Sequence, residues 1–239
     1  METKLSELSI FFPFWNEEKN IELIVSKAIE IAPTIANRYE IIIVDDGSSD
    51  NTLRIAQRLA KSNPNIKIVS HSPNRGYGAA IKEGLEAAQY EYIVFTDGDG
   101  QFDFAEITHF IPEIKNADIV IGFRKKRRDR KLLKRLLLMN LLKFGDYILF
   151  GFRFRDIDCG FKMFRKSAVG EISPLRSEGA MITTEILAKA KRKKLRIAQV
   201  GVTHYPREHG IQTGANLPVI IRAVLESLTL WLDINNKRF

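Results

Sequence analysis

Short apolar runs alternate with helical patterns through the first 120 residues, and no other feature of the sequence limits the fold as much. Apolar or β-branched runs at LSIFF, YEIIIV, NIKIV and YIVF are separated by three stretches with helical spacing of apolar residues. Strand–helix units of this length are typical of a parallel sheet with right-handed crossovers. The run IIIV at residues 41–44 predicts a strand that is covered on both faces. We therefore expect an α/β fold with a mostly parallel central sheet flanked by helices.

Three of these strands run into polar residues where they end. FPFWNEE follows the first strand, VDDGSSDNT ends the second, and TDGDGQ ends the fourth. The carboxyl ends of parallel strands share one edge of a sheet, and ligands bind at that edge in open α/β folds. Asp97 and Asp99 repel each other unless another charge offsets them, and Mg²⁺ or Mn²⁺ is the natural partner of two carboxylates. The alternative is a polar turn whose acids are simply solvated.

The glycine-rich segments disfavour two other classes of nucleotide-binding protein. Neither GYGAAI nor GDGQFD has the G-x-G-x-x-G spacing of dinucleotide-binding folds, and the sequence has no Walker A motif. A dehydrogenase or an ATPase is therefore disfavoured. The single cysteine, Cys159, excludes an internal disulfide and suits a reducing compartment. His204 and His209 lie five positions apart in an expected loop, and a metal role is disfavoured for them.

Four motifs of the first half carry a family resemblance. The order and spacing of PFWNE, DDGSSD, NRGYGAA and DGDGQ resemble the family 2 glycosyltransferases, whose nucleotide-sugar-binding domain has the GT-A fold. GFR at 122–124, DIDCGF at 156–161 and the segment 185–210 look like the branch that transfers a sugar to a polyprenyl phosphate, as dolichyl-phosphate mannose synthases do. Cys159 departs from that branch, in which serine is commoner at this position. The resemblance implies a metal-dependent inverting transferase that uses a nucleotide-sugar donor and a polyprenyl (dolichyl- or undecaprenyl-type) phosphate acceptor.

The resemblance also implies where the donor binds. Carboxylates can accept hydrogen bonds from a base and a ribose, and Glu17, Asp45 and Asp46 fit that task. Gly76 and Gly78 would let the backbone approach the nucleotide, with N–H groups at the start of the following helix. The expected donor-binding residues are Pro13, Trp15, Asn16, Glu17, Asp45, Asp46, Gly47, Ser48, Asn74, Gly76, Gly78, Asp97, Gly98 and Asp99.

The metal and the acceptor phosphate need groups of opposite charge. The resemblance implies that Asp99 binds the metal, with Asp97 nearer the nucleotide and Gln101 close enough to help. Arg124 and Arg207 match positions where relatives keep phosphate-binding arginines. Glu185 either orients the acceptor or the sugar, or is an ordinary helix acid. The expected catalytic residues are Asp97, Asp99, Arg124, Asp156 and Glu185, and the expected acceptor-phosphate residues are Arg124, Arg207, Arg130 and Arg135.

Charge divides the 239 residues into two unlike halves. The net charge of +8 combines 11 Lys and Arg against 19 Asp and Glu in residues 1–120 with 26 against 10 in residues 121–239. We expect a single domain with a donor-binding half over 1–122 and an acceptor- and membrane-facing half over 123–239. A basic nucleic-acid- or membrane-binding module is the non-enzyme alternative. The acidic edge of the first half speaks against nucleic acid, because it would repel phosphate. A family 2 enzyme with a polysaccharide or lipid-headgroup acceptor is the enzyme alternative, although the sequence lacks the QxxRW motif of processive polymerases.

The segment 124–135 holds nine basic residues among twelve and is followed by LLLMNLL. Without aromatic residues to stack on bases, it fits an interfacial helix on anionic lipid better than a nucleic-acid site; a solvated basic loop is the alternative. The expected amphipathic helix at 217–234 would serve as a peripheral anchor or as a contact in a homo-oligomer. No run reaches the roughly 20 apolar residues of a membrane-spanning helix. We therefore expect a cytoplasmic protein bound peripherally to the cytoplasmic face of a membrane.

Overall fold

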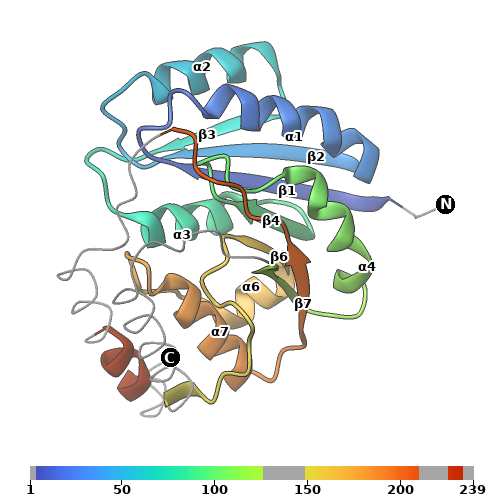
Figure 1. Cartoon of the computed structure of the whole chain (residues 1–239), viewed down its shortest axis with the longest axis vertical. Coiled ribbons are helices and arrows are strands. Elements are labelled where there is room, and N and C mark those ends of the chain that lie inside the picture. The colour runs from blue at the N-terminus through green and yellow to red at the C-terminus, as the bar shows by residue number, and fades with distance from the viewer. Residues whose placement is uncertain (1–3, 126–148, 210–225, 234–239) are drawn as a thin grey trace.

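The computed structural model describes residues 4–125, 149–209 and 226–233 (Figure 1). Within these ranges the strands are β1 (Leu5–Phe14), β2 (Ala36–Asp45), β3 (Ile66–Ser70), β4 (Tyr92–Thr96), β5 (Ile119–Arg124), β6 (Phe161–Arg165) and β7 (Ile197–Val202). The helices are α1 (Ile21–Ile35), α2 (Thr52–Ser62), α3 (Tyr77–Ala87), the 3-10 helix η1 (Phe104–His109), α4 (Ile111–Ile114), α6 (Lys166–Ile172) and α7 (Ile182–Arg192). Residues 226–233 are also helical.

The described strands form one seven-stranded sheet in the order β3-β2-β1-β4-β6-β5-β7. The pairs β1–β2, β1–β4, β2–β3 and β5–β7 are parallel, while β6 runs antiparallel to both β4 and β5. The prediction of a mostly parallel sheet in an α/β fold is confirmed. Strands from both halves of the charge division lie in this one sheet, so the acidic and basic segments share a core.

Helices cover both faces of the sheet, as Figure 1 shows: α1 and α2 lie on one side, and α3, α6 and α7 on the other. The run at residues 41–44 reflects this two-sided cover most clearly in the sequence. Ile41 and Ile43 join the core beneath α1 and α2, whereas Ile42 and Val44 join the core beneath α3 and α7. All four side chains are fully buried. A strand with both faces covered must be continuously apolar, which is why this stretch does not alternate.

At the N-termini of α1 and α2, side-chain hydrogen bonds connect each helix to the loop before it. Asn20 occupies the N-cap position of α1, yet its side chain donates to Glu17 Oε2 at 2.6 Å and makes no cap hydrogen bond. At α2, Asp50 Oδ1 accepts from the Thr52 backbone N–H at 2.9 Å. Both interactions tie a helix start to the loop after a strand, and so they fix the edge where the polar residues gather.

Most of the segments that we expect at the membrane lie outside the described residues. Residues 126–148 and 210–225 lie outside the described residues, and with them most of the basic leucine-rich segment and of the expected helix at 217–234. Within the described ranges, every helix is too short or too polar to cross a bilayer.

Candidate active site

A cleft of about 630 Å³ opens at the carboxyl ends of β1, β2 and β4. Ten of the predicted donor residues line it, which places most of the predicted site in one cavity. Four further residues complete the lining: Phe14, Tyr77, Ala80 and Arg207. The full lining is Pro13, Phe14, Trp15, Asn16, Glu17, Asp46, Asn74, Gly76, Tyr77, Ala80, Asp97, Gly98, Asp99 and Arg207.

The parallel register of the strands brings these segments together. Phe14 at the end of β1 pairs with Asp45 at the end of β2, and the Asp46 backbone N–H donates to the Phe14 carbonyl at 2.9 Å. On the other side of β1, β4 ends at Thr96, and the Asp97 N–H donates to the Gly160 carbonyl at 3.0 Å. The chain therefore delivers three polar loops to one edge because the strands that precede them run parallel and pair with one another.

Asp46 organises the wall of the cleft. Its Oδ1 accepts from the ring Nδ1 of His71 at 2.7 Å and from the Arg75 N–H at 2.9 Å. Its Oδ2 accepts from the Asn74 side chain at 2.8 Å and from the Gly76 N–H at 2.8 Å. Four donors occupy the two oxygens, so Asp46 shapes the turn at 72–76 from within. Direct contact of this carboxylate with a nucleotide stays a prediction; the structure shows that it holds that turn.

Three other predicted donor residues support the cleft without lining it. Asp45 is 1% exposed, and its Oδ2 accepts from Ser70 Oγ at 3.2 Å. Gly47 has φ +68°, and a Cβ there would come within 2.5 Å of the Asn74 backbone nitrogen. Ser48 Oγ accepts from the Asn16 N–H at 3.0 Å. Asp45 and Ser48 make hydrogen bonds within the protein behind the cavity surface, and Gly47 allows the backbone at Asn74 to approach closely.

The glycines before and in α3 lie close to another part of the protein's own backbone. A Cβ on Gly76 would lie 2.6 Å from the Glu178 carbonyl oxygen, and one on Gly78 would lie 2.6 Å from the Ser177 carbonyl oxygen. The N–H groups of Gly78 and Ala79 donate to the Glu178 carbonyl at 2.8 and 3.3 Å. The start of α3 is therefore covered by the protein's own loop at 176–179. Gly78 accordingly does not line the cleft, and only Gly76 does.

Asp97 faces the cavity from a crowded position. The Tyr77 hydroxyl donates to its Oδ1 at 2.7 Å, and a Cβ on Gly160 would overlap its carboxylate. Burial raises the pKa of Asp97, while the Tyr77 hydrogen bond and the charges of Lys162 and Arg124 oppose that rise. The fully buried Lys162 donates from Nζ to the Ile157 carbonyl at 3.1 Å and also to that of Cys159. A cation beneath the sheet edge thus partly balances Asp97.

Asp99 and Glu17 approach one guanidinium from two sides. Arg207 forms an ion pair with Glu17 through Nη2, and its Nη1 lies 3.5 Å from Asp99 Oδ2. Burial and the neighbouring charge of Asp97 raise the pKa of Asp99 to about 6. Burial also raises the pKa of Glu17, against the effects of Asn20 and Arg207. Arg207 was expected at the acceptor phosphate, but it lies in the same cleft as the expected donor residues.

Arg124 and Asp156 form a buried pair at the end of β5. Arg124 donates from Nε to Asp156 Oδ2 at 2.6 Å and from Nη2 to Oδ1 at 2.9 Å. The Asp156 side chain is 3% exposed, whereas that of Arg124 is 17% exposed. Neither residue lines the cleft. Asp156 fixes the guanidinium by a two-point contact, and the charge of Arg124 reaches Asp97.

Glu185 is fully buried in α7 and does not reach the cleft. Its carboxylate accepts from the N–H groups of Arg176 at 2.9 Å and Ser177 at 2.7 Å, and it pairs with Lys189 at 2.8 Å. Burial raises its pKa, but these partners outweigh burial and the pKa is lowered. The two roles predicted from the sequence were contact with acceptor or sugar and an ordinary helix acid. The structure shows a third: Glu185 holds the loop that covers the start of α3.

The donor set at the cleft suits a hard divalent cation that is shared with a ligand. Within the described residues, no cluster of three or more His, Cys, Asp or Glu side chains could hold a metal on its own. Asp97 and Asp99 supply two carboxylates, which is the number that Mg²⁺ commonly takes from a protein when phosphate oxygens complete its shell. Gln101 does not line the cleft, and its side-chain nitrogen donates to the Tyr205 carbonyl at 3.0 Å. Of the predicted ligands, the two aspartates fit best.

Tyr77 was not predicted from the sequence as a site residue, and two of the residues that were predicted lie outside the described ranges. Tyr77 stands inside the glycine-rich motif that drew attention to the backbone, and the aromatic side chain between the glycines was the available signal. Arg130 and Arg135, predicted as additional phosphate ligands, lie outside the described residues.

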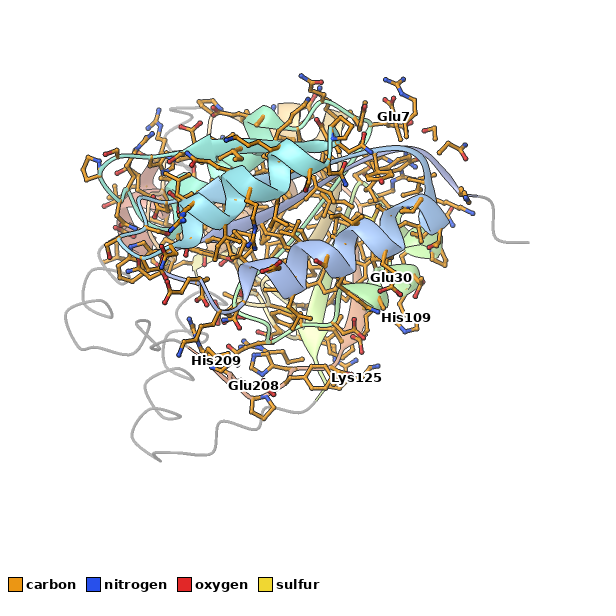
Figure 2. The ribbon with its side chains drawn as sticks, turned by 90° about the horizontal axis from the view of Figure 1, so that it is seen from above. Glu7, Glu30, His109, Lys125, Glu208 and His209 are labelled. Atoms are coloured by element: carbon orange, nitrogen blue, oxygen red, sulfur yellow. The ribbon has the colours of Figure 1, made fainter. Side chains whose placement is uncertain are left out.

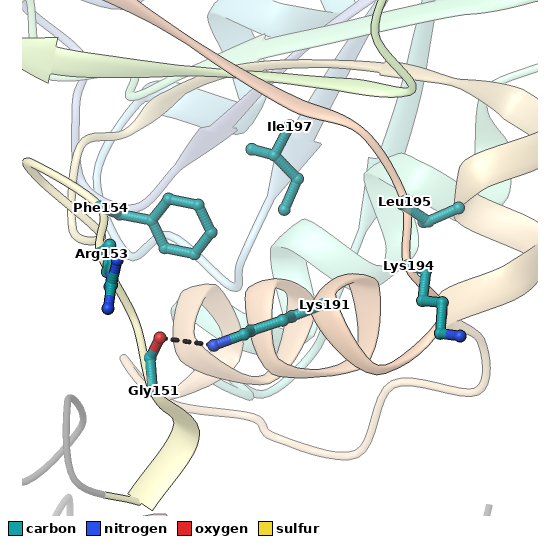
Figure 3. Close-up of a pocket in the computed structure, with 7 residues that line it drawn as sticks. All are labelled: Gly151, Arg153, Phe154, Lys191, Lys194, Leu195 and Ile197. Carbon is teal, nitrogen blue, oxygen red and sulfur yellow. Dashed lines mark hydrogen bonds between the residues drawn. The ribbon is translucent and has the colours of Figure 1, made fainter.

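A second cleft, of about 710 Å³, lies between α7 and residues 151–154 (Figure 3). Lys191 reaches across it to the Gly151 carbonyl. None of the predicted site residues lines this cleft, and its described lining offers no carboxylate to a metal. The cleft at β1, β2 and β4 is therefore the candidate active site. The lining of the second cleft is Gly151, Arg153, Phe154, Lys191, Lys194, Leu195 and Ile197.

Comparison with known sequences gives a consistent set of matches. Residues 9–173 match the profile described as Glycosyl transferase family 2. The dolichyl-phosphate beta-glucosyltransferase of Saccharomyces cerevisiae is 31% identical over 220 residues, which cover 82% of this chain and 66% of the yeast protein. The dodecaprenyl-phosphate galacturonate synthase of Rhizobium johnstonii is 28% identical over 237 residues, which cover 97% of this chain and 68% of that protein. The chain spans about two thirds of the length of these curated relatives.

Solved structures share the architecture. Glucosyl-3-phosphoglycerate synthase from Mycobacterium tuberculosis, in complex with phosphoglyceric acid, superposes with a TM-score of 0.70 at 19% identity, covering 94% of this chain and 80% of that chain. The same enzyme in complex with Mn²⁺, uridine diphosphate and glucosyl-3-phosphoglycerate gives a TM-score of 0.67 at 20% identity, covering 95% and 80%. At this level of identity, the similarity shows a shared fold.

Proposed function

The chain belongs to glycosyltransferase family 2 and has the GT-A fold, and on that premise we propose that it transfers a sugar from a nucleotide-diphosphate sugar to a polyprenyl phosphate. One observation carries the proposal: two carboxylates, Asp97 and Asp99, and one guanidinium, Arg207, line a single cleft at the carboxyl ends of the parallel strands. The curated relatives named above act on polyprenyl phosphates, which supports the choice of acceptor.

The cleft offers a separate contact for each part of such a donor. Trp15 is 45% exposed at its rim and presents a flat apolar face to a base. Glu17 lines the same cleft and can accept a hydrogen bond from a ribose, whereas the Asn16 side-chain oxygen already accepts from the backbone and hydroxyl of Ser49. Arg207 can donate two parallel hydrogen bonds to a diphosphate. Its present partners, Glu17 and Asp99, show that the guanidinium already lies beside the carboxylates that would face the donor.

A divalent cation held by Asp99 and Asp97 would offset the charge that develops on the leaving diphosphate. The glucosyl-3-phosphoglycerate synthase structures contain Mn²⁺ with uridine diphosphate, which supports this combination on the shared fold. Tyr77 orients Asp97 through its hydroxyl, and Lys162 and Arg124 balance the Asp97 charge. The chain's own residues thus hold the acidic pair in place before any ligand arrives.

The reaction itself needs little acid–base help. An oxygen of the acceptor phosphate forms a bond to the anomeric carbon, the bond from that carbon to the diphosphate breaks, and its electron pair leaves with the nucleoside diphosphate. The acceptor oxygen is already anionic, so no proton must be removed from it. Attack opposite the leaving group inverts the anomeric centre. Arg124, fixed by Asp156, is the cation that we assign to the acceptor phosphate.

The acceptor places the reaction at a lipid surface. The segment 124–135 begins with Arg124 and holds nine basic residues including it, and anionic lipid attracts such segments. We therefore assign residues 1–122 together with Arg207 to the donor, the rest of residues 123–239 to the acceptor and the membrane, and the protein to the cytoplasmic face of a membrane.

A donor panel tests the proposal. Purified protein is mixed with short-chain polyprenyl phosphate, Mg²⁺ or Mn²⁺, and each of several nucleotide sugars, and release of nucleoside diphosphate is followed together with formation of the glycolipid. We expect release that depends on both the acceptor and the metal. Release with a polysaccharide or a lipid headgroup, and not with polyprenyl phosphate, would reassign the acceptor. No donor binding under any condition would refute the enzyme assignment.

A further inference from the structure

His71 lies between two carboxylates in the interior of the protein. It follows β3 directly and is 8% exposed. Its ring Nδ1 is 2.7 Å from Asp46 Oδ1, and its Nε2 is 3.7 Å from Glu83 Oε1. Among the described residues, Nε2 is buried and makes no hydrogen bond. A buried ring nitrogen that faces an acid without bonding to it needs an explanation, because buried polar groups are nearly always satisfied.

The proton arrangement around the ring follows from its neighbours. Asp46 accepts four hydrogen bonds and has none to give, so the proton on Nδ1 points to Asp46. A ring with that one proton presents the lone pair of Nε2 to the carboxylate of Glu83. A second proton on Nε2 turns this repulsive contact into an attractive one. Arg75 also faces this group of charges, through Glu83 at 3.1 Å.

The two partners of His71 connect it to the turn and the helix that form one wall of the donor cleft, although Glu83 itself does not line the cavity. Asp46 lines the cleft and holds the turn at 72–76 through Asn74, Arg75 and Gly76. Glu83 lies on α3, the helix whose first residue is Tyr77, the partner of Asp97. His71 therefore joins the turn and the helix that together form one side of the cavity.

We propose that His71 is a positioning residue for the donor cleft, and that it holds the wall formed by residues 72–76 and α3 most firmly when both ring nitrogens carry a proton. The consequence for donor binding rests on the function proposed above, whereas the link between the ring and the wall is a property of the fold. A lower pH favours the form of the ring that carries two protons. The contribution of His71 to donor affinity should accordingly grow as the pH is lowered.

Two substitutions test the contact between His71 and Glu83 separately from the contact between His71 and Asp46. His71→Asn keeps a donor for Asp46 but cannot take up a proton or reach Glu83. Glu83→Gln removes the second carboxylate; it also removes the exposed pair with Arg75, a small loss that is the same at both pH values. Donor affinity is measured by calorimetry at about pH 6 and about pH 8.5, and the protonation of the His71 ring at each pH is read by nuclear magnetic resonance. Both variants should bind donor about fivefold more weakly than the wild type at the lower pH, the size of a modest ion-pair contribution, and nearly equally at the higher pH. The ratio to wild type removes the opposing effect of Asp99, which all of these proteins share.

His109→Asn is the matched control, since His109 is an exposed histidine of η1 (Figure 2). It should bind donor as the wild type does at both pH values. A His71→Asn deficit of equal size at both pH values would mean that the ring acts only as a neutral spacer, and would overturn the proposal. So would the absence of any deficit.

Nuclear magnetic resonance tests the link without any donor. The chain has four histidines, so the ring nitrogens of His71 can be assigned by comparison with His71→Asn. On acidification, the Nε2 proton should appear while the Nδ1 proton persists, and the amide signals of residues 74–77 should move with the same midpoint. If the amide signals of residues 74–77 do not change as the ring is protonated, His71 does not position this wall. This result would refute the proposal even if His71→Asn proved too unstable to use. If no nucleotide sugar binds at any pH, the proposed function fails, and this measurement still decides the role of His71.

Discussion

Substitution of Arg207 tests whether this residue binds the donor diphosphate or the acceptor phosphate. The sequence indicated an acceptor-phosphate ligand, yet the guanidinium pairs with Glu17 and lies 3.5 Å from Asp99. If Arg207 binds the donor diphosphate, Arg207→Ala should weaken donor binding about tenfold to a hundredfold, because a charge-assisted hydrogen bond contributes about 1.5–3 kcal/mol. Arg207→Lys should recover only part of this, since an ammonium group lacks the planar fork.

The same substitution should affect the metal in the opposite direction. Arg207 is a positive charge beside Asp99, so its removal leaves that carboxylate more available to a cation. Calorimetry with Mn²⁺ alone should show unchanged or tighter binding in Arg207→Ala, while titration with nucleotide sugar in the presence of Mn²⁺ shows the loss. Arg196→Ala, which removes an arginine from an exposed pair with Asp118, is the matched control and should leave both affinities as they are.

The outcome that would refute this reasoning is specific. If Arg207→Ala leaves donor affinity unchanged but raises the KM for polyprenyl phosphate, the guanidinium serves the acceptor, as the sequence resemblance implied. Equal losses for donor and acceptor would place it between the two substrates, at the bond that is transferred.

Three further predictions follow from the same geometry. Asp99→Asn should abolish metal-dependent donor binding, and wild-type transfer should fall as the pH drops through about 6, because the pKa of Asp99 lies at about 6 and a protonated carboxyl is a poor ligand; calorimetry and a pH–rate profile check both. Arg124→Ala should raise the KM for polyprenyl phosphate more than it weakens donor binding, and urea unfolding should show a loss of about 3–5 kcal/mol, because it takes the guanidinium away from the buried carboxylate of Asp156. Replacing residues 125–128 by glutamate should release the protein from anionic liposomes at about 1 kcal/mol per charge while donor affinity persists, and continued sedimentation with liposomes would contradict the interfacial role of this segment.

The fold and the edge of the site were predictable because their signals are local. A strand covered on both faces must be apolar at every position, and the run at 41–44 meets that condition. Polar residues directly after such strands must lie at the carboxyl edge of the sheet. Asp97 and Asp99 therefore reached one cavity with Asn16 and Glu17, although some 80 residues separate the two pairs in the chain.

The roles of individual residues were less predictable because they depend on distant backbone. Gly76 and Gly78 permit a close approach, as a glycine-rich motif indicates, but the approaching group is the loop at 176–179. A ligand and a loop of the same chain leave the same mark in the sequence, a missing side chain. Asp46 poses the same difficulty: a strand-end carboxylate can face a nucleotide or the turn that follows it, and here four donors of that turn and of His71 fill its oxygens.

Lys162 shows why the acidic edge can exist at all. It lies in β6, where FKMFR would ordinarily place a lysine on a solvated face, yet it is fully buried. Its ammonium is satisfied by the backbone carbonyls of Ile157 and Cys159, partners that no side-chain pattern reveals. From there its charge acts on Asp97 beneath the edge, while Arg124 and Arg207 act on it from other directions. The protein therefore balances the carboxylate that its parallel strands deliver, and a cation brought by the donor meets a site that is already assembled.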